Sequence, residues 1–230
     1  MALTYRALAA LLNYPTPELQ QAIPEIAASL GDEAMLPAAS LAALRPLLER
    51  LAAEDIYAAQ ERYHLLFDRS RTLSLHLFEH IHGESRDRGQ AMVDLLRLYE
   101  EHGMTPRADE LPDFLPLFLE FLSLLPAAEA RTLLHEPAGI LAAIAARLAA
   151  RDAAYAGAFQ ALLALTETTP EVADPGEVED PNDLAALDAA WEEAAVQFGP
   201  GEPGDGCSTA RLAVRLRASQ REVRLQENVP

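Results

Sequence analysis

The sequence contains no lysine, a single cysteine, and half as many basic as acidic residues. All 18 basic residues are arginines, against 36 acidic residues, and the formal net charge is −18. Because the phosphates of nucleic acids and the head groups of anionic membranes require cationic partners, this balance argues against both as binding partners. It favours a basic or amphipathic partner, and it keeps the chain soluble.

The lone cysteine, Cys207, excludes an intramolecular disulfide and a zinc finger, and it suits a reducing compartment. The most apolar long stretch, residues 111–128, carries two acids and three prolines, which argues against a membrane-spanning helix. Residues 1–14 are apolar, but Arg6 interrupts them and no clear cleavage site follows, so they predict a first helix rather than a signal peptide. Together these features predict a cytoplasmic protein without membrane insertion.

Apolar residues recur at every third or fourth position, for example in 41–51, 93–99 and 140–148. This spacing is typical of helix faces, and no convincing alternation of the kind found in strands accompanies it. A chain of 230 residues, half of them hydrophobic, can bury a sizeable core. The sequence therefore predicts an all-α protein with a single globular helical domain.

Prolines mark several expected helix ends. Pro15 and Pro17 separate the first helix from the second. One amphipathic helix is expected over 54–69, and one or two helices over 139–168, with a joint near Arg151.

The last part of the chain changes in composition. A final helix is expected over 183–198, followed by a segment rich in glycine and proline. The tail beyond that segment carries five arginines and two acids. We therefore expect an all-helical domain over 1–198 and a linker with a mobile, Arg-rich tail over 199–230.

Chemically reactive and charged residues are densest in the run 77–93 (LFEHIHGESRDRGQAMV), which holds two histidines, three acids and two arginines. Polar residues at so many consecutive positions reduce the apolar area that this segment can bury in a helical core. A specific role for these residues is therefore expected. Gly83 is expected to end one helix and Ser85 to cap the next, which crowds the charged side chains into one corner. The residues expected at this corner are His80, His82, Glu84, Arg86, Asp87 and Arg88.

Two roles fit such a corner. It either braces the junction between two helices through ion pairs, or it presents side chains to a partner. We expect presentation for His82 and Arg88. We expect bracing for Asp87, because an acid in the first turn of a helix is favourably placed.

The same region contains His76-Leu-Phe-Glu-His80, which matches the H-x-x-E-H pattern of one group of zinc proteases. In such a site both histidines bind zinc from one helix face, and Glu79 acts as the base. A third ligand is needed as well, and nothing in the sequence singles one out. The simpler interpretation is a polar, hydrogen-bonded patch at a helix end, made of Glu79, His80, His82 and Glu84.

Two further segments are candidates for a binding surface. Segment 110–116 (ELPDFLP) places prolines at the start of an apolar helix, with Glu110 and Asp113 as its polar residues. It is either part of a site or a capped core helix. In YHLLF, Tyr63 and Phe67 lie one turn apart on one helix face. They either line a groove or anchor the core.

The run 78–90 (FEHIHGESRDRGQ) resembles the signature of the respiratory nitrate reductase assembly chaperones, the NarJ type. These belong to a wider family of molybdoenzyme chaperones that includes the TorD and DmsD types. Segments 11–15, 63–71, 110–124 and 184–193 also resemble their counterparts, in the same order.

One family motif is only partly present. The wider family has an acidic-Pro-x-Asp-His motif, in which Asp113 matches the aspartate whereas Phe114 replaces the histidine. Any role of a titrating histidine at that position therefore cannot be transferred to this chain.

The resemblance implies a dedicated cytoplasmic chaperone, not an enzyme, with an all-helical TorD-like fold. Chaperones of this type bind the N-terminus of the apo catalytic (alpha) subunit of respiratory nitrate reductase. They hold it open for insertion of the molybdenum guanine dinucleotide cofactor and are absent from the mature enzyme. No permanent cofactor is implied, and any contact with the molybdenum guanine dinucleotide would be transient and made on the client.

The resemblance and the residue patterns together define a predicted client-binding set. The alternatives left open are a zinc-dependent hydrolase built on His76, Glu79 and His80, and a structural subunit of an acidic complex. The predicted client-binding residues are Tyr63, Leu66, Phe67, Phe78, His80, His82, Glu84, Arg86, Asp87, Arg88, Glu110 and Asp113.

Overall fold

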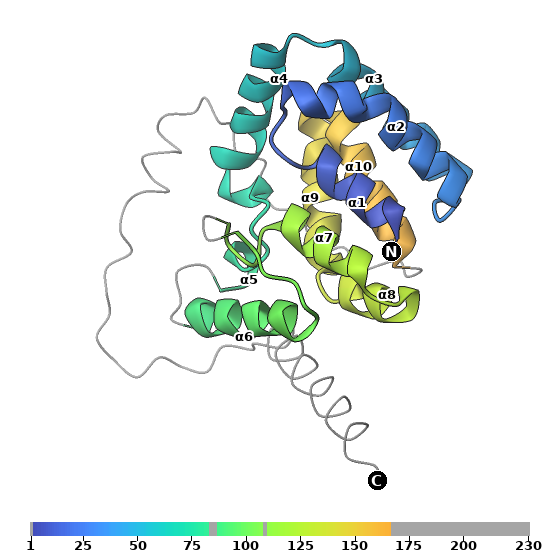
Figure 1. Ribbon diagram of the computed structural model, residues 1–230. Coiled ribbons are helices and arrows are strands. Elements are labelled where there is room, and N and C mark those ends of the chain that lie inside the picture. Colours follow the sequence, from blue (N-terminus) through green and yellow to red (C-terminus); the bar gives the residue numbers. More distant parts are fainter. Residues whose placement is uncertain (1, 83–86, 108–109, 167–230) are drawn as a thin grey trace, which may run out of the picture.

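The computed structural model describes residues 2–82, 87–107 and 110–166 (Figure 1). Several expectations concern residues outside these ranges: the roles of Glu84 and Arg86, the final helix over 183–198, and the linker and tail over 199–230. The helix boundary expected at Gly83 and Ser85 also lies outside the described residues.

Within the described residues the chain is helical and contains no strand, which confirms the all-α prediction. A single isolated antiparallel bridge joins His76 to Phe114. The elements are α1 (Leu3–Leu11), α2 (Pro17–Glu33), α3 (Ala38–Ala53), α4 (Ile56–Tyr63), η1 (His64–Asp68), η2 (Arg71–Leu73), α5 (Glu79–His82), α6 (Asp87–Glu101), α7 (Leu115–Leu124), α8 (Ala127–His135), α9 (Ala138–Arg151) and α10 (Ala153–Leu165).

Local sequence explains where several helices begin. Pro17 is the first residue of α2, and the Thr16 hydroxyl accepts a hydrogen bond from the Leu19 N–H, which satisfies a free donor of the first turn. Asp55 caps α4 in the same way. Asp152 forms the expected joint, since it ends α9 and caps α10.

Helix α10 lies between α3 and α9, and α1 packs against α7 and α2 (Figure 1). The approach of α10 to α3 depends on Gly157, because a Cβ atom there would lie 2.2 Å from the carbonyl oxygen of Ala43. Only a residue without a side chain allows the two backbones to come this close.

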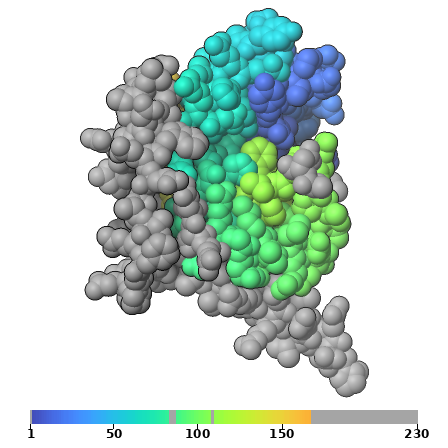
Figure 2. Space-filling view, turned by 90° about the vertical axis from the view of Figure 1, so that its left-hand side faces the viewer, coloured from blue at the N-terminus to red at the C-terminus, as the bar shows by residue number. Residues whose placement is uncertain are grey.

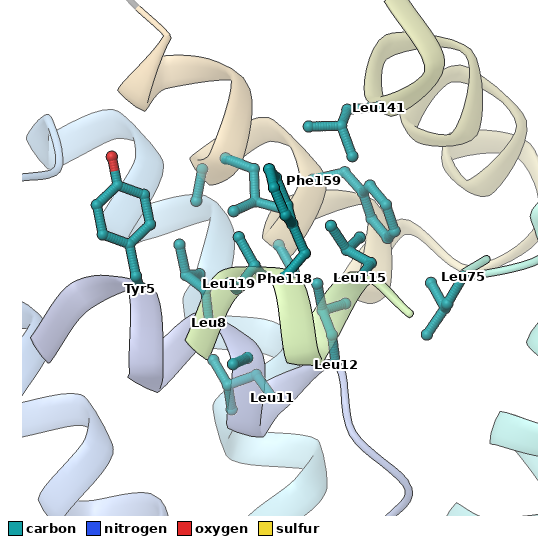
Figure 3. Close-up of a cluster of buried hydrophobic side chains, with 14 of the residues drawn as sticks. Tyr5, Leu8, Leu11, Leu12, Leu75, Leu115, Phe118, Leu119, Leu141 and Phe159 are labelled. Atoms are coloured by element: carbon teal, nitrogen blue, oxygen red, sulfur yellow. The ribbon is translucent and has the colours of Figure 1, made fainter. Parts of the chain in front are cut away.

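The centre of the core is a cluster of buried leucines and aromatic residues. Helix α7 is buried along most of its length, as its proline-bounded apolar sequence predicts. Each fully buried leucine or phenylalanine stabilises the fold by about 1.5–3 kcal/mol. Figure 3 shows this cluster, which includes Tyr5, Leu8, Leu11, Leu12, Leu75, Leu115, Phe118, Leu119, Leu141 and Phe159.

The helix predicted over 54–69 is present, but its last turn is a π-helix, η1. Tyr63, the last residue of α4, and Phe67, in η1, are both buried, and their ring centroids lie 5.0 Å apart. The Tyr63 hydroxyl donates a hydrogen bond to the Leu12 carbonyl oxygen (3.1 Å), and Phe67 packs edge-on against Tyr155. Both aromatics therefore anchor the core, one of the two roles that the sequence left open.

No single helix among the described residues is long and apolar enough to cross a membrane. By length and composition, α8 and α9 pass that test only as a pair, and they are bent by 66° at their junction. Their apolar side chains, including Leu134, Leu141 and Leu148, are buried in the core.

Candidate functional site

The histidine-rich run and the Pro-Asp segment, far apart in the sequence, lie side by side in the fold. The Leu77 N–H donates to the Asp113 carbonyl oxygen (3.0 Å), and the Leu115 N–H donates to the Leu75 carbonyl oxygen (2.8 Å). Atoms of the two segments, green and lime, are neighbours on the face in Figure 2. The sequence predicted both segments as candidate sites, and the structure joins them into one.

The side chain of Asp113 is the hub of this region. It is fully buried, and its Oδ2 accepts a hydrogen bond from the Phe78 N–H at 3.1 Å. Its Oδ1 lies 3.2 Å from Nδ1 of His76, and Nη2 of Arg88 lies 3.8 Å from Oδ2. A buried carboxylate requires such partners, because removing an unpaired charge from water is costly.

Arg88 links three elements. Its Nη2 forms an ion pair with Glu79 of α5 (3.2 Å) in addition to its approach to Asp113. Arg88 itself lies in the first turn of α6. Because the guanidinium is held by two carboxylates, its position favours bracing over the presentation expected from the sequence. Asp87, next to it, is exposed.

His80 is largely enclosed, and its Nε2 donates a hydrogen bond to the Ser74 carbonyl oxygen (2.8 Å). Burial lowers its pKa below the usual value, and the nearby Arg147 acts in the same direction, whereas the bond to Ser74 opposes the shift. Burial thus favours the neutral form of the ring, and its hydrogen bond ties α5 to the preceding loop.

His82 differs from His80. It is half-buried, and its ring packs edge-on against Phe78, with centroids 5.8 Å apart. Within the described part of the chain its nitrogens have no hydrogen-bond partner, so they can serve an incoming group. We call the whole cluster the Asp113 corner: Ser74, His76, Phe78, Glu79, His80, His82, Arg88 and Asp113.

The remaining predicted residues lie elsewhere. Tyr63, Leu66 and Phe67 belong to the core, and each is less than a tenth exposed. As direct client contacts they remain a prediction, which would require neighbouring elements to move. Glu110 is half-buried and lies close to Glu120. The pKa of Glu120 is raised by the burial of its own carboxyl group and by the negative charge of Glu110.

The sequence did not identify His76 as a partner of Asp113. The two lie 37 positions apart, and only the bridge between their segments brings them together. The His76 ring also stacks on Phe114, with centroids 5.4 Å apart. An imidazole thus lies beside Asp113 although the histidine of the family motif is replaced in this chain.

The structure does not support the zinc hydrolase alternative. Helix α5 begins at Glu79, so His76 precedes it and the two histidines do not share a helix face. His76 is hydrogen-bonded to Asp113, and His80 donates a hydrogen bond to the backbone carbonyl oxygen of Ser74. Among the described residues, no group of three or more histidine, cysteine, aspartate or glutamate side chains could hold a metal ion.

Comparison with known proteins places these features in context. Residues 15–161 match the family described as nitrate reductase delta subunit. The chain is 44% identical over 214 residues to the nitrate reductase molybdenum cofactor assembly chaperone NarJ of Escherichia coli (strain K12), covering 90% of this chain and 88% of that protein. It is 50% identical over 137 residues to the probable chaperone NarW of the same strain, covering 58% and 59%. It is 30% identical over 168 residues to the probable NarJ of Bacillus subtilis (strain 168), covering 72% and 89%.

Proposed function

This chain belongs to the nitrate reductase delta subunit family, and we propose that it is a dedicated chaperone that assists molybdenum cofactor insertion during nitrate reductase maturation. Its client is the apo catalytic (alpha) subunit of nitrate reductase, and it binds the N-terminal peptide of that subunit. It has no catalytic role of its own and no permanent cofactor. It works in the cytoplasm and is absent from the mature enzyme.

The observation that carries this proposal is the extent of the family match. Residues 15–161 include both segments of the Asp113 corner, together with helices α2 to α9. The likeness to an assembly chaperone therefore spans the scaffold and the candidate site rather than one isolated motif.

The geometry favours a division of labour within the corner. Asp113, Arg88 and His80 are engaged in internal hydrogen bonds and ion pairs, so they hold the two segments together. Within the described residues no hydrogen bond engages the His82 ring, and we assign it to contact with the client. The acidic chain attracts a basic, amphipathic peptide helix. The negative charge of the chain raises the association rate constant more than it raises the affinity of the final complex.

Deletion of the gene tests the proposed function. In the deletion strain the nitrate reductase subunits are expected to accumulate and assemble without molybdenum and without activity. Restoring the gene on a plasmid should recover both molybdenum content and activity. Full activity in the deletion strain would contradict the proposal. Co-purification of this protein with the mature enzyme would instead support a structural subunit.

A further inference from the structure

Three exposed leucines lie on α1, on α7 and on the segment just before α7. Leu3, Leu111 and Leu124 are each 43–49% exposed, and within the described residues none of them packs against the hydrophobic core. The Ala2 N–H donates to the Ser123 carbonyl oxygen at 2.9 Å, so the start of α1 lies beside the end of α7. A single exposed leucine needs no explanation, but several on adjoining elements are typical of a surface that another segment or protein covers.

Two acids give the same surface a negative charge. Glu120 lies one turn before Leu124 in α7, and Glu110 directly precedes Leu111. Burial and the nearby Glu110 raise the pKa of Glu120, and Arg6 opposes this shift only in part. Two carboxylates that repel each other favour a cation between them, so a basic, amphipathic segment fits this surface. We call it the leucine face: Leu3, Glu110, Leu111, Glu120 and Leu124.

The sequence itself contains a segment of this kind, outside the described residues. Segment 207–230 holds five of the 18 basic residues of the chain but only two of its 36 acidic residues. Its apolar residues Leu212, Leu216 and Val223 recur at intervals of four and seven, the spacing of one helix face. Arg215 directly precedes Leu216, so the pattern combines apolar and cationic side chains as the leucine face requires.

The path of the chain allows this segment to reach the leucine face. Helix α10 ends at Leu165 and packs against α1, and Figure 1 shows its end (orange) near the start of α1 (dark blue). Segment 207–230 begins about 40 residues beyond Thr166, a length that spans up to roughly 130 Å when extended. Because the segment is tethered to the same chain, its effective concentration at the face is high, and a weak contact suffices to hold it there.

We propose that segment 207–230 docks on the leucine face of its own chain, with its apolar side chains on the leucines and an arginine between Glu110 and Glu120. There it competes with the client peptide, which is also basic and amphipathic and whose predicted contacts include Glu110 and Asp113. The competition rests on the proposed function, whereas the docking does not. A client must displace the segment, so peptides that bind weakly are rejected.

Cys207 allows the docking to be measured in the full chain. It is the only cysteine and lies at the start of the segment, so a nitroxide label attaches at that position alone. In NMR spectra the label should weaken the amide signals of Leu3 and Leu124. The signal of Tyr57 should be weakened less, because it lies on α4, which Figure 1 shows apart from α7. Equal weakening of all three signals would overturn the proposal.

The informative variant of the face is Glu120→Gln, which should remove most of the weakening at Leu3 and Leu124. The matched control is Glu61→Gln, which removes the same charge from an exposed residue of α4 and should leave the weakening unchanged. The nitroxide and the isotope label are then placed on different copies of the chain. Weakening in that mixed sample would assign the docked segment to a second copy and would contradict intramolecular docking.

Titration calorimetry with the N-terminal client peptide tests the competition. A full chain with Arg215→Gln, Arg217→Gln and Arg221→Gln should bind the peptide about threefold more tightly than the unaltered chain, as expected if the segment covers the face for two thirds of the time. Equal affinities would overturn the competition. A peptide that binds neither chain would contradict the proposed function, whereas the nitroxide experiment would still decide whether the segment docks.

Discussion

Asp113 illustrates how one buried residue holds two distant segments together. It accepts hydrogen bonds from a backbone N–H and an imidazole and lies close to a guanidinium, all from residues 76–88. Its removal would leave the buried Phe78 N–H without an acceptor and would deprive His76 and Arg88 of a partner. The cost of such unpaired groups is usually larger than the value of the original bonds.

We expect Asp113→Ala to lower the free energy of unfolding by about 2–4 kcal/mol, because the Phe78 N–H and the His76 ring lose their buried acceptor and Arg88 loses one of its two carboxylates. Urea unfolding measures the change. The control is Glu100→Ala on the exposed face of α6, which should change stability by less than about 0.5 kcal/mol. Equal midpoints for the two variants would show that Asp113 is not a structural hub.

His82 and Arg88 should respond differently to substitution. Arg88→Ala removes the link between α5, α6 and Asp113, so it should lower the melting temperature. His82→Ala removes only an edge contact with Phe78, so the fold should persist while nitrate reductase activation in cells falls.

Thermal melts paired with complementation of the deletion strain separate the two roles. Full complementation by His82→Ala would remove His82 from the proposed client surface. An unchanged melt of Arg88→Ala, together with lost activation, would restore presentation as the role of Arg88.

At the scale of elements, the contact between α3 and α10 depends on the absence of one side chain. A Cβ atom at position 157 would meet the carbonyl oxygen of Ala43 at 2.2 Å, so the helices would have to separate. Because both helices carry fully buried side chains, such a shift would disturb the packing of the core.

We expect Gly157→Ala to lower the free energy of unfolding by about 1–3 kcal/mol, the usual cost of overpacking. Gly139→Ala is the matched control. It lies in α9, and a Cβ atom there meets nothing within 4 Å, so alanine should be neutral or stabilise by up to about 1 kcal/mol. Chemical unfolding of both variants gives the comparison. A stable Gly157→Ala variant would mean that α3 and α10 can separate without loss.

At the scale of the whole molecule, net charge governs encounter with a partner. With a formal charge of −18, the chain attracts a basic peptide over long distances, but salt screens this attraction beyond about 8–10 Å at physiological ionic strength. We expect the association rate constant with the N-terminal client peptide to fall with salt, and the dissociation rate constant to change less.

Stopped-flow measurements at low and high ionic strength give both rate constants. A neutral variant of the peptide provides the control, because its association should depend little on salt. An association rate constant of the basic peptide that does not change with salt would limit the role of the charge to solubility.

Much of the fold was predictable because helices are encoded locally. The spacing of apolar residues identified the helix faces, and Pro17 and Asp152 lie at predicted helix boundaries. The π-helical turn at 64–68 was not predicted, because the same residues fit a regular amphipathic helix. Its geometry depends on how Tyr63 and Phe67 pack against residues far away in the sequence.

The sequence by itself determined the helical class, the acidic surface and the motif that resembles the assembly chaperones. The first two follow from composition and from the spacing of apolar residues, and the third is a resemblance carried by the run 78–90. Only the tertiary structure decided that His76 lies beside Asp113 and that Arg88 is held between two carboxylates. These facts depend on which segments meet across the fold, and no local pattern specifies the burial and pairing that result.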